Sequence, residues 1–253
     1  MKLVKLKNIE KNFKRDGFIH VKKIFSKKEI LEVLQNIEEI KEKFKKTKYK
    51  HMHFTKDKKF NTIHNINKFV KEGKIFELSK DKRLTSIIKH IIGKNISLRN
   101  LEFFLKPKKT GKKAPIHQDN FFWNIPSKKA VNVWIACTPS NFKNGGVFYF
   151  LKSHKDGLVN HEQSFQAGTS QKISKNHLAL KKYKKIYPTL SAGDCIIHHC
   201  EVIHGSNFNK SKFDRIGLVM SFKNKKAKID KKGWVNYQKK LKINLKYLNK
   251  SIK

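Results

Sequence analysis

The sequence predicts a mainly β protein with flanking helices, arranged as one sandwich or barrel. Two helical patterns lie between residues 26 and 92, and short β-rich runs separated by Pro, Gly, Asn and Lys begin at residue 96. A chain of 253 residues is long enough for one large β domain, and 38% hydrophobic residues supply its interior. We expect a single domain over residues 1–253, made of a helical and strand N-terminal support (1–95), a β core (96–222) and a basic C-terminal extension (223–253).

Turn and capping signals mark the N-terminal elements. After an extended start, the Asp-Gly pair at 16–17 predicts a turn that leads into a short strand at 18–21. Ser26 then precedes a helix, with Glu29 at the capping-box position, and this helix should run to about Lys46. Its apolar residues recur near the helical period, so we expect one face to pack on a sheet.

The central elements follow a polar stretch. Residues 47–75 are polar and mixed, and we assign no regular element there. From residue 75 to 92 apolar side chains return at helical spacing, and Gly93 is a stop signal. The β-rich runs that come next are 96–106, 130–138, 146–151, 195–199 and 215–222.

Two segments outside these runs carry their own predictions. Residues 155–190 are polar and show little periodicity, yet they are too many for a structureless loop, so we interpret them as a mobile lid or substrate-specificity insert. The segment from Lys223 is rich in Lys, but its apolar residues favour a docked helix: Trp234, Tyr237, Leu241, Ile243, Leu245 and Leu248.

A formal net charge of +40 is the most extreme bulk property, and it favours a polyanionic partner such as nucleic acid or an acidic membrane surface. However, the basic residues are spread along the chain, and only those at 15, 83, 99 and 215 are Arg, the residue best suited to bases and phosphates. Compositional bias explains much of the Lys, although not the presence of only 19 acidic residues. Nucleic acid is therefore a disfavoured partner that stays open.

The compartment is predicted from the cysteines and the N-terminus. Cys137, Cys195 and Cys200 form no C-x-x-C pair and cannot all be joined in disulfides, which favours a reducing, cytoplasmic location. The first residues contain no apolar run of signal-peptide length, and no stretch approaches 18 uncharged apolar residues. We expect no membrane span.

His117 and Asp119 form the first part of a candidate metal site. If this segment is extended, alternate side chains point to one face, where an imidazole and a carboxylate can share an ion. Such a short motif also occurs by chance, and a surface hydrogen-bonding pair is the alternative interpretation.

A second segment strengthens this interpretation. Residues 193–199 predict a turn and a strand that ends shortly before His204, which can supply a third ligand from a neighbouring strand. Two His and one carboxylate leave three positions of the ion open, as in non-haem Fe(II) oxygenases and unlike closed zinc sites. Those positions would serve a 2-oxo acid and O2.

Arg215 stands at the start of an apolar strand, where a buried guanidinium would need an anionic partner. The far carboxylate of a dicarboxylic cosubstrate is one such partner, because it can take the bidentate fork of Arg. An internal salt bridge to Asp214 or Asp194 is the alternative.

These motifs, in this order, resemble the phytanoyl-CoA dioxygenase family over most of the chain. The matching pieces are Asp16-Gly17-Phe18 with the Ser26 helix, His117-Gln118-Asp119, Val133-Trp134-Ile135-Ala136, Asn144-Gly145-Gly146, Ser153-His154-Lys155-Asp156-Gly157, Gly193-Asp194, His204-Gly205-Ser206-Asn207 and Arg215. The resemblance implies a double-stranded β-helix (jelly roll, cupin-like) core, Fe(II) held by His117, Asp119 and His204, and 2-oxoglutarate held by Arg215, Ser206 and Trp134. Members that halogenate lack the carboxylate ligand, so Asp119 favours hydroxylation.

Several residues near the motifs have two readings. Phe121, Phe122 and Trp123 either line a substrate pocket or fill the core. His198 and His199 lie on an apolar run, which favours packing or support of the ligands, while His154 and His161 should order a loop. Cys200 lacks the other parts of a catalytic triad and is expected to be a small packing residue.

Together these observations predict an Fe(II)- and 2-oxoglutarate-dependent dioxygenase that uses O2 and releases succinate and CO2. The expected substrate is a small molecule or acyl thioester with an unactivated C–H bond, and an anionic group would suit the Lys-rich surface. The alternative is a non-catalytic basic module on the same fold that binds nucleic acid or another polyanion. A third option is Zn or Mn chemistry without an oxo acid, which Arg215 disfavours.

Overall fold

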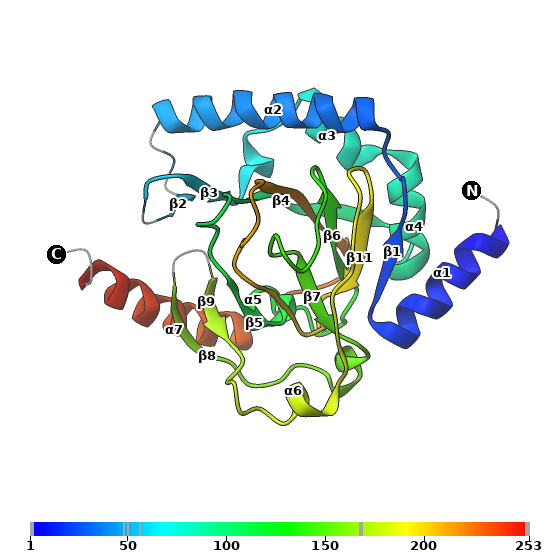
Figure 1. Cartoon of the computed structure of the whole chain (residues 1–253). Helices are drawn as coiled ribbons and strands as arrows, with labels where there is room; N and C mark the ends of the chain where they lie inside the picture. The colour runs from blue at the N-terminus through cyan, green and yellow to red at the C-terminus, as the bar shows by residue number, and fades with distance from the viewer. Residues whose placement is uncertain (1–2, 48, 50, 56, 167–168, 251–253) are drawn as a thin grey trace.

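The computed structural model describes residues 3–47, 49, 51–55, 57–166 and 169–250 (Figure 1). Two antiparallel sheets face each other in it. The large sheet has the order β1 (Phe18–Val21), β11 (Cys195–His199), β6 (Ala130–Ala136), β13 (Arg215–Asn224), β4 (Ile96–Lys106), β3 (Phe60–Ile63) and β2 (Met52–Phe54). The small sheet has the order β10 (Lys185–Ile186), β7 (Val147–Phe150), β12 (His204–Ser206) and β5 (Ala114–His117).

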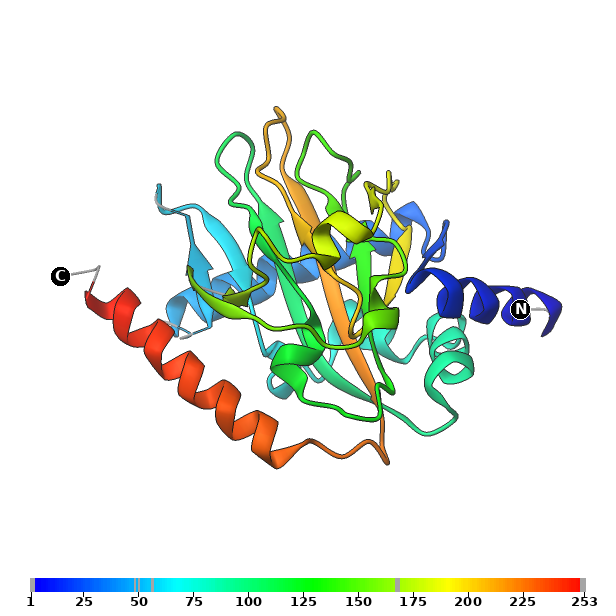
Figure 2. The ribbon, with the colours of Figure 1, turned by 90° about the horizontal axis from the view of Figure 1, so that it is seen from below.

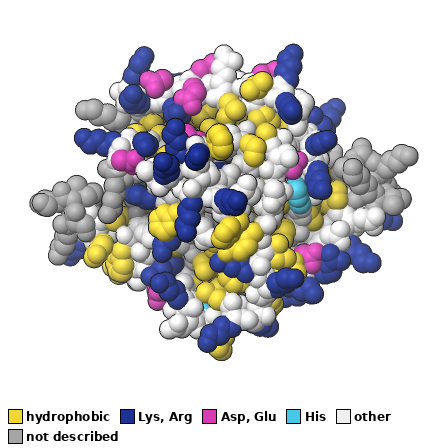
Figure 3. All heavy atoms as spheres, viewed as in Figure 1, with side chains coloured by type: hydrophobic (Ala, Val, Ile, Leu, Met, Phe, Trp, Pro, Cys, Tyr) yellow, Lys and Arg dark blue, Asp and Glu magenta, His cyan; other side chains and the backbone are white. Residues whose placement is uncertain are grey.

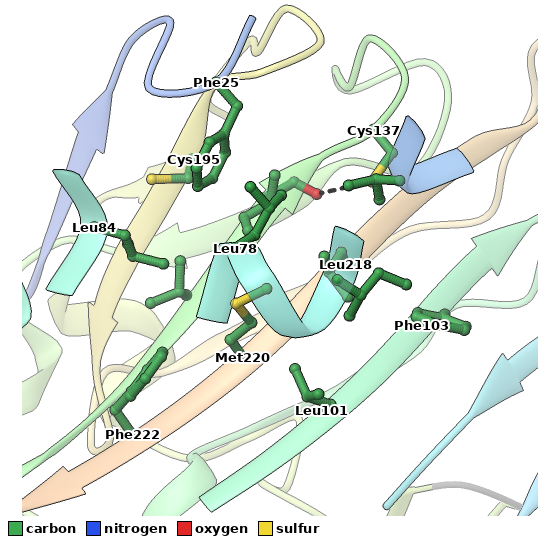
Figure 4. Packing of buried hydrophobic residues seen from close by; sticks show 14 of the residues in the cluster. Phe25, Leu78, Leu84, Leu101, Phe103, Cys137, Cys195, Leu218, Met220 and Phe222 are labelled. Carbon is green, nitrogen blue, oxygen red and sulfur yellow. Dashed lines mark hydrogen bonds between the residues drawn. The ribbon is translucent and has the colours of Figure 1, made fainter. Parts of the chain in front are cut away.

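Helices cover the outer face of the large sheet. The capping box of Ser26 and Glu29 begins α2 (Lys27–Lys46), as the sequence predicts. This helix, α3 (Gly73–Lys80) and α4 (Lys82–Ile92) lie over the sheet in Figure 1. Apolar side chains of the sheet and helices meet there in the main core, seen in Figure 4, which includes Leu78, Leu84, Leu101, Phe103, Leu218, Met220 and Phe222.

Alternation along β13 and β6 explains why the opposite face of the large sheet is free for function. Leu218 and Met220 belong to the main core, whereas Val219 belongs to a second cluster between the two sheets. On β6 Trp134 lies in that inter-sheet cluster too. The jelly-roll architecture expected for the chain is therefore present. Helices cover one face of the large sheet, and the space between the two sheets lies on its other face.

Two sequence predictions about the N-terminal part were wrong, and a third stretch carries elements that the sequence did not locate. The start is not extended but forms α1 (Leu3–Asp16), which packs beside β1 and α4. Residues 75–92 form two helices rather than one, because Asp81 ends α3 and caps α4 by accepting from the Arg83 N–H. The polar stretch 47–75 contains two short strands, β2 and β3, and the 3-10 helix η1 (Ile66–Lys68).

The two remaining segments are ordered into regular elements. Residues 155–190 hold part of η2 (Ser153–Asp156), then β8 (Glu162–Gln166), β9 (Thr169–Lys172), α6 (Ala179–Lys182) and β10. The C-terminal segment forms α7 (Lys231–Lys250), which packs on the β8–β9 hairpin and on α5 (Asp119–Trp123), as Figure 2 shows. Its docked face does not use all the expected residues, since Trp234, Ile243 and Leu245 are exposed.

No helix in the described part of the chain is both long enough and apolar enough to traverse a bilayer.

Candidate metal centre

Three side chains meet between the sheets where the small sheet faces the large one. His117 ends β5, Asp119 begins α5, and His204 begins β12 opposite His117 in the β5–β12 register. Their ligand atoms all lie within 4.8 Å of one another. The Asp119 Oδ1 atom is 3.6 Å from Nε2 of His117 and 3.8 Å from Nε2 of His204.

The local backbone explains why His117 and Asp119 face the same way. The strand expected through the motif ends at His117, but Gln118 keeps an extended conformation with φ −122° and ψ 133° before α5 begins. The alternation of side chains therefore holds for one more residue. The Gln118 side chain points away from the other two and connects two loops, because its Nε2 donates to the carbonyls of Gly157 and Glu201 at 2.7 Å each.

Both imidazoles are oriented by backbone carbonyls. The Nδ1 atom of His117 lies 2.7 Å from the Pro115 carbonyl, and that of His204 lies 3.0 Å from the Val202 carbonyl. Each Nδ1–H can donate there, which leaves Nε2 as a free lone pair directed at Asp119. Burial lowers the pKa of His204 to about 3, so this ring is neutral near pH 7.

The Asp119 carboxylate is fixed through its other oxygen. Oδ2 accepts from His198 Nε2 at 2.9 Å and from Asn132 Nδ2 at 3.0 Å. Burial alone would raise the pKa of Asp119, but the imidazoles of His204, His117 and His198 outweigh it and hold this pKa well below its ordinary value. His198 thus supports the ligand Asp119, as its place on the apolar strand suggested.

These donors fit a divalent transition-metal ion. Two imidazole nitrogens and one carboxylate oxygen converge from one side, which is the donor set of non-haem Fe(II) oxygenases. Asp119 and His204 are each only 7% exposed, so the alternative of a surface hydrogen-bonding pair is wrong.

Arg215 provides a second feature, because its guanidinium is buried without a counter-ion. It is 1% exposed and lies over the Trp134 ring, with Cζ 5.3 Å from the ring centroid. Nη2 donates to the Gly145 carbonyl at 3.3 Å, while Nε and Nη1 have no hydrogen-bond partner among the described residues. A buried cation in this state calls for an anionic ligand.

The two carboxylates considered as internal partners of Arg215 are engaged elsewhere. Asp214 accepts from the backbone N–H of Lys108 at 2.7 Å. Asp194 accepts from the N–H of Lys23 at 2.8 Å and lies 3.0 Å from His20. Neither forms an ion pair with Arg215 in the described part of the chain.

A buried lysine beside Arg215 escaped the sequence analysis. Lys106 ends β4 opposite Arg215, so both side chains leave the same face of the sheet. Its ammonium donates to the Asn207 carbonyl, and burial together with the charge of Arg215 lowers the pKa of Lys106 well below its ordinary value. Only the strand register distinguishes this lysine from the many exposed ones. Two adjacent buried cations fit the far carboxylate of a dicarboxylic acid.

Trp134 and Ser206 lie on strands that border the same inter-sheet space as Arg215. Trp134 fits beside Arg215 because Gly217 has no side chain, since a Cβ at that position would lie 2.3 Å from the indole ring. Ser206 is buried two residues after His204 on β12 and lies opposite Val147. Their roles toward a cosubstrate stay predictions.

The three aromatic residues after Asp119 have different surroundings. Trp123 is 6% exposed and packs in a small core cluster, which fits the core-filling interpretation. Phe122 lies edge-on to His117, with centroids 5.7 Å apart, and Phe121 stacks on His161 at 4.2 Å. Phe122 is thus the ring beside the metal ligands, and a substrate contact by it stays a prediction.

The neighbouring histidines behave as loop anchors. The Nε2 atom of His161 accepts from the Gln118 N–H at 3.0 Å, and Nδ1 lies 2.8 Å from the Val159 carbonyl. His154 Nε2 lies 3.1 Å from the Lys14 carbonyl. Cys200 is fully buried and packs with Trp123.

Solved structures confirm the fold. EctD from S. alaskensis, solved with 2-oxoglutarate and 5-hydroxyectoine, matches with a TM-score of 0.74 and 18% identity over 91% of this chain and 78% of that one. The epimerase SnoN of nogalamycin biosynthesis, in complex with Fe3+ and alpha ketoglutarate, matches with a TM-score of 0.74 and 16% identity over 93% and 90%.

Sequence relatives extend the likeness beyond the fold. A probable alpha-ketoglutarate-dependent hypophosphite dioxygenase from Stutzerimonas stutzeri is 22% identical over 81% of this chain and 74% of its own length. Human peroxisomal phytanoyl-CoA dioxygenase is 25% identical over 63% of this chain, and the match spans about half of that relative, 49%. The family model described as phytanoyl-CoA dioxygenase matches residues 13–217. The chain therefore belongs to the phytanoyl-CoA dioxygenase family of iron- and 2-oxoglutarate-dependent oxygenases.

Proposed function

We propose that this protein is an Fe(II)- and 2-oxoglutarate-dependent dioxygenase that hydroxylates an unactivated C–H bond of a small molecule or acyl thioester, releasing succinate and CO2. The observation that carries the proposal is the buried Arg215 guanidinium, whose Nε and Nη1 lack partners among the described residues. Arg215 lies over Trp134, which packs in the same inter-sheet cluster as Tyr149. Tyr149 in turn stands opposite the candidate ligand His204 in the small sheet, so both features border one inter-sheet space. A dicarboxylic 2-oxo acid can satisfy both ends of this space.

One group of residues would bind the metal at one end of this space, and another would bind the cosubstrate carboxylate at the other end. His117, Asp119 and His204 would hold the metal, and Arg215 with Lys106 would hold the far carboxylate of 2-oxoglutarate. When bound, the iron and the oxo acid together supply the oxidising power by reducing O2. The chain's part is to fix these groups and to leave coordination positions open.

Two features of the chain would fix these groups and keep coordination positions open. His198 and Asn132 keep Oδ2 of Asp119 engaged, so the carboxylate offers one oxygen to the metal rather than two. An apolar lining then excludes bulk water from the space between the ends, and its buried members are Trp134, Ala136, Tyr149, Leu190, Ile196, Val202 and Val219.

The same donor set favours hydroxylation over halogenation. Family members that halogenate lack the carboxylate ligand, and here Asp119 is present, buried and held in place by two hydrogen bonds. A metal site of this kind has no free position for a halide in place of Asp119.

A basic binding module is the second candidate, because the proposed oxygenase reaction does not account for the net charge of +40. Figure 3 shows Lys and Arg side chains scattered over the whole visible face, interrupted by hydrophobic patches. A nucleic-acid surface instead gathers its basic residues along one stripe or groove. The scattered pattern therefore favours the enzyme.

Anaerobic titration of the purified protein with Fe(II) and 2-oxoglutarate tests the proposal. The visible charge-transfer band of the chelated oxo acid should appear in the wild type and weaken in Arg215→Ala. Arg83→Ala is the matched control, because Arg83 is a half-exposed surface arginine paired with Asp81 and Glu29. An absent band, together with a tightly held zinc ion, would contradict the proposal and make polyanion affinity against salt the next measurement.

A further inference from the structure

Three of the four arginines have a partner or a role, and one does not. Arg15 pairs with Asp16, and Arg83 pairs with Asp81 and Glu29, all at the surface. Arg215 faces the proposed cosubstrate. The side chain of the fourth, Arg99, forms no hydrogen bond or ion pair with any residue that the structure describes. Its guanidinium instead contacts an aromatic ring.

Arg99 is placed at the edge of the metal centre by an irregularity in β4. Asn100 pairs with Ser221 and Leu98 with Phe222, so Arg99 is the extra residue of a bulge in this strand. Its guanidinium lies over the ring of Trp123, with Cζ 4.8 Å from the ring centroid. Trp123 is the last residue of the five-residue helix α5 that Asp119 begins.

No residue that the structure describes forms an ion pair with Arg99. Its charge attracts the carboxylates of Glu102 and Asp119, but both are already held by other donors. Glu102 Oε1 lies 2.8 Å from His64 Nδ1 and accepts from Asn100 Nδ2 at 2.8 Å. Partial burial lowers the pKa of Arg99, although the group stays a cation at neutral pH.

A row of aromatic rings links Arg99 to the metal ligands. Tyr237 on α7 lies within electrostatic reach of Arg99 and contacts Phe122 edge-on, with centroids 5.6 Å apart. Phe122 in turn lies edge-on to His117 at 5.7 Å. Arg99 and the Phe122–Tyr237 pair therefore border the same region beside the metal residues.

We propose that Arg99 binds an anionic group of the primary substrate, a carboxylate or a phosphoryl group, while Phe122 and Tyr237 contact the adjoining apolar part. This inference rests on the proposed dioxygenase function. The Trp123 ring contacts the guanidinium, while the N–H donors of Arg99 have no partner among the described residues and are free to take a bidentate anion. An anion held there places the neighbouring carbon atoms beside the His117, Asp119 and His204 donors.

The small number of arginines permits a direct test. In protein labelled with ¹⁵N-arginine and loaded with Zn(II) and 2-oxoglutarate, four side-chain Nε–H signals are expected, and Arg→Lys variants assign them. Hexanoate, hexyl phosphate and the neutral hexanamide are titrated in separate arms. The Arg99 signal should shift saturably with one or both anions and not with hexanamide, while the Arg15 and Arg83 signals stay in place. The arm that saturates first distinguishes a carboxylate from a phosphoryl ligand.

Variants measure the contribution of Arg99 itself, with the Trp123 indole N–H signal as the reporter. Arg99→Gln should weaken anion affinity by about tenfold to a hundredfold, as the loss of a charge-assisted pair predicts. Arg99→Lys should fall between the two proteins, because the charge remains and the fork does not. Arg15→Gln removes the same charge at a distant surface site and should change nothing.

The outcomes separate this inference from the proposed function. An Arg99 signal that ignores both anions, or that responds equally to hexanamide, overturns the inference, as does unchanged anion affinity in Arg99→Gln. The Arg215 signal reports the cosubstrate site independently, since addition of 2-oxoglutarate should shift it in both the wild type and Arg99→Gln. A silent Arg215 signal would contradict the proposed function instead.

Discussion

His198 donates a 2.9 Å hydrogen bond from Nε2 to Oδ2 of Asp119, and its Nδ1 lies 3.2 Å from the Tyr149 hydroxyl. Because Nε2 carries the proton, Nδ1 accepts from the tyrosine, and the tautomer is fixed from both sides. The carboxylate is therefore presented to the metal by a chain of three buried residues, of which only Asp119 would touch the ion.

His198→Leu should weaken Fe(II) binding by about 10-fold to 100-fold, the usual cost of losing a supporting hydrogen bond to a metal ligand. The side chain volume is roughly kept, so the loss reports on orientation of Asp119 rather than on packing. Asp119→Ala removes the carboxylate ligand itself and should abolish succinate formation, which gives the lower limit of activity for this series of variants. His90→Gln, a change at a half-buried surface pair with Glu10, is the control. Full succinate production by Asp119→Ala would refute the metal assignment.

Lys106→Met tests whether the buried lysine helps Arg215 hold the cosubstrate. We expect the 2-oxoglutarate affinity to fall by about tenfold or more, because hydrogen bonds to charged groups contribute about 1.5–3 kcal/mol. The metal-free, cosubstrate-free protein should be no less stable, since Lys106 is buried beside another cation and burial disfavours its charge. Calorimetric titration with 2-oxoglutarate and urea denaturation measure the two effects. Unchanged affinity would assign Lys106 to structure alone.

Gly217 and Trp134 offer a test of packing around the cosubstrate site. A Cβ at Gly217 would lie 2.3 Å from the Trp134 ring, so Gly217→Ala must displace the indole or the strand. Overpacking of this kind costs about 1–3 kcal/mol, and 2-oxoglutarate binding should weaken as well. The double variant Gly217→Ala/Trp134→Leu removes the three clashing indole atoms and should recover stability relative to Gly217→Ala. Additive losses in the double variant would show that the clash is not the cause.

The sequence predicted the parts of the fold that carry strong local signals. The β4 strand occupies residues 96–106 as expected, and the Ser26 capping box begins α2. The helix α1 was missed although Leu6, Ile9 and Phe13 have helical spacing, because its stability comes from packing against the core. The strands β2 and β3 are too short to show a pattern, and they form by pairing at the sheet edge.

In the site, too, residues within local motifs were predicted from the sequence, whereas residues placed by tertiary contacts were not. His117, Asp119 and His204 lie in recognisable motifs, and the structure brings them together. The cations Lys106 and Arg99 carry no motif, because one acquires its role from strand register and the other from a bulge that turns it toward Trp123. Long-range pairing of this kind leaves no trace in the periodicity of a single sequence.

The lid interpretation of residues 155–190 is tested by hydrogen exchange with and without Fe(II) and 2-oxoglutarate. The segment is not structureless, since β8 and β9 pair and α7 packs on them, so any motion should involve the hairpin as a unit. We expect amides of the described hairpin residues to gain protection on cosubstrate binding, while those of β13 stay protected throughout. Strong, unchanged protection in both states would argue against a lid.

Buried neutral histidines predict a loss of stability in mild acid. Burial lowers the pKa of His161 to about 3, whereas a histidine in the unfolded chain titrates near a pKa of about 6.5. Below pH 6.5 the unfolded chain therefore binds a proton that the folded chain does not, so the free energy of unfolding falls as the pH drops toward 3. At pH 5 this single group accounts for about 2 kcal/mol.

His161→Gln isolates that contribution. Gln has no titrating group in this range and can still accept from the Gln118 N–H. Urea denaturation of the metal-free protein at pH 5 and pH 7 gives the stability difference for each variant. We expect this difference to shrink by about 2 kcal/mol in His161→Gln. An unchanged difference in His161→Gln would mean that the buried ring takes up its proton in the folded state as readily as in the unfolded chain.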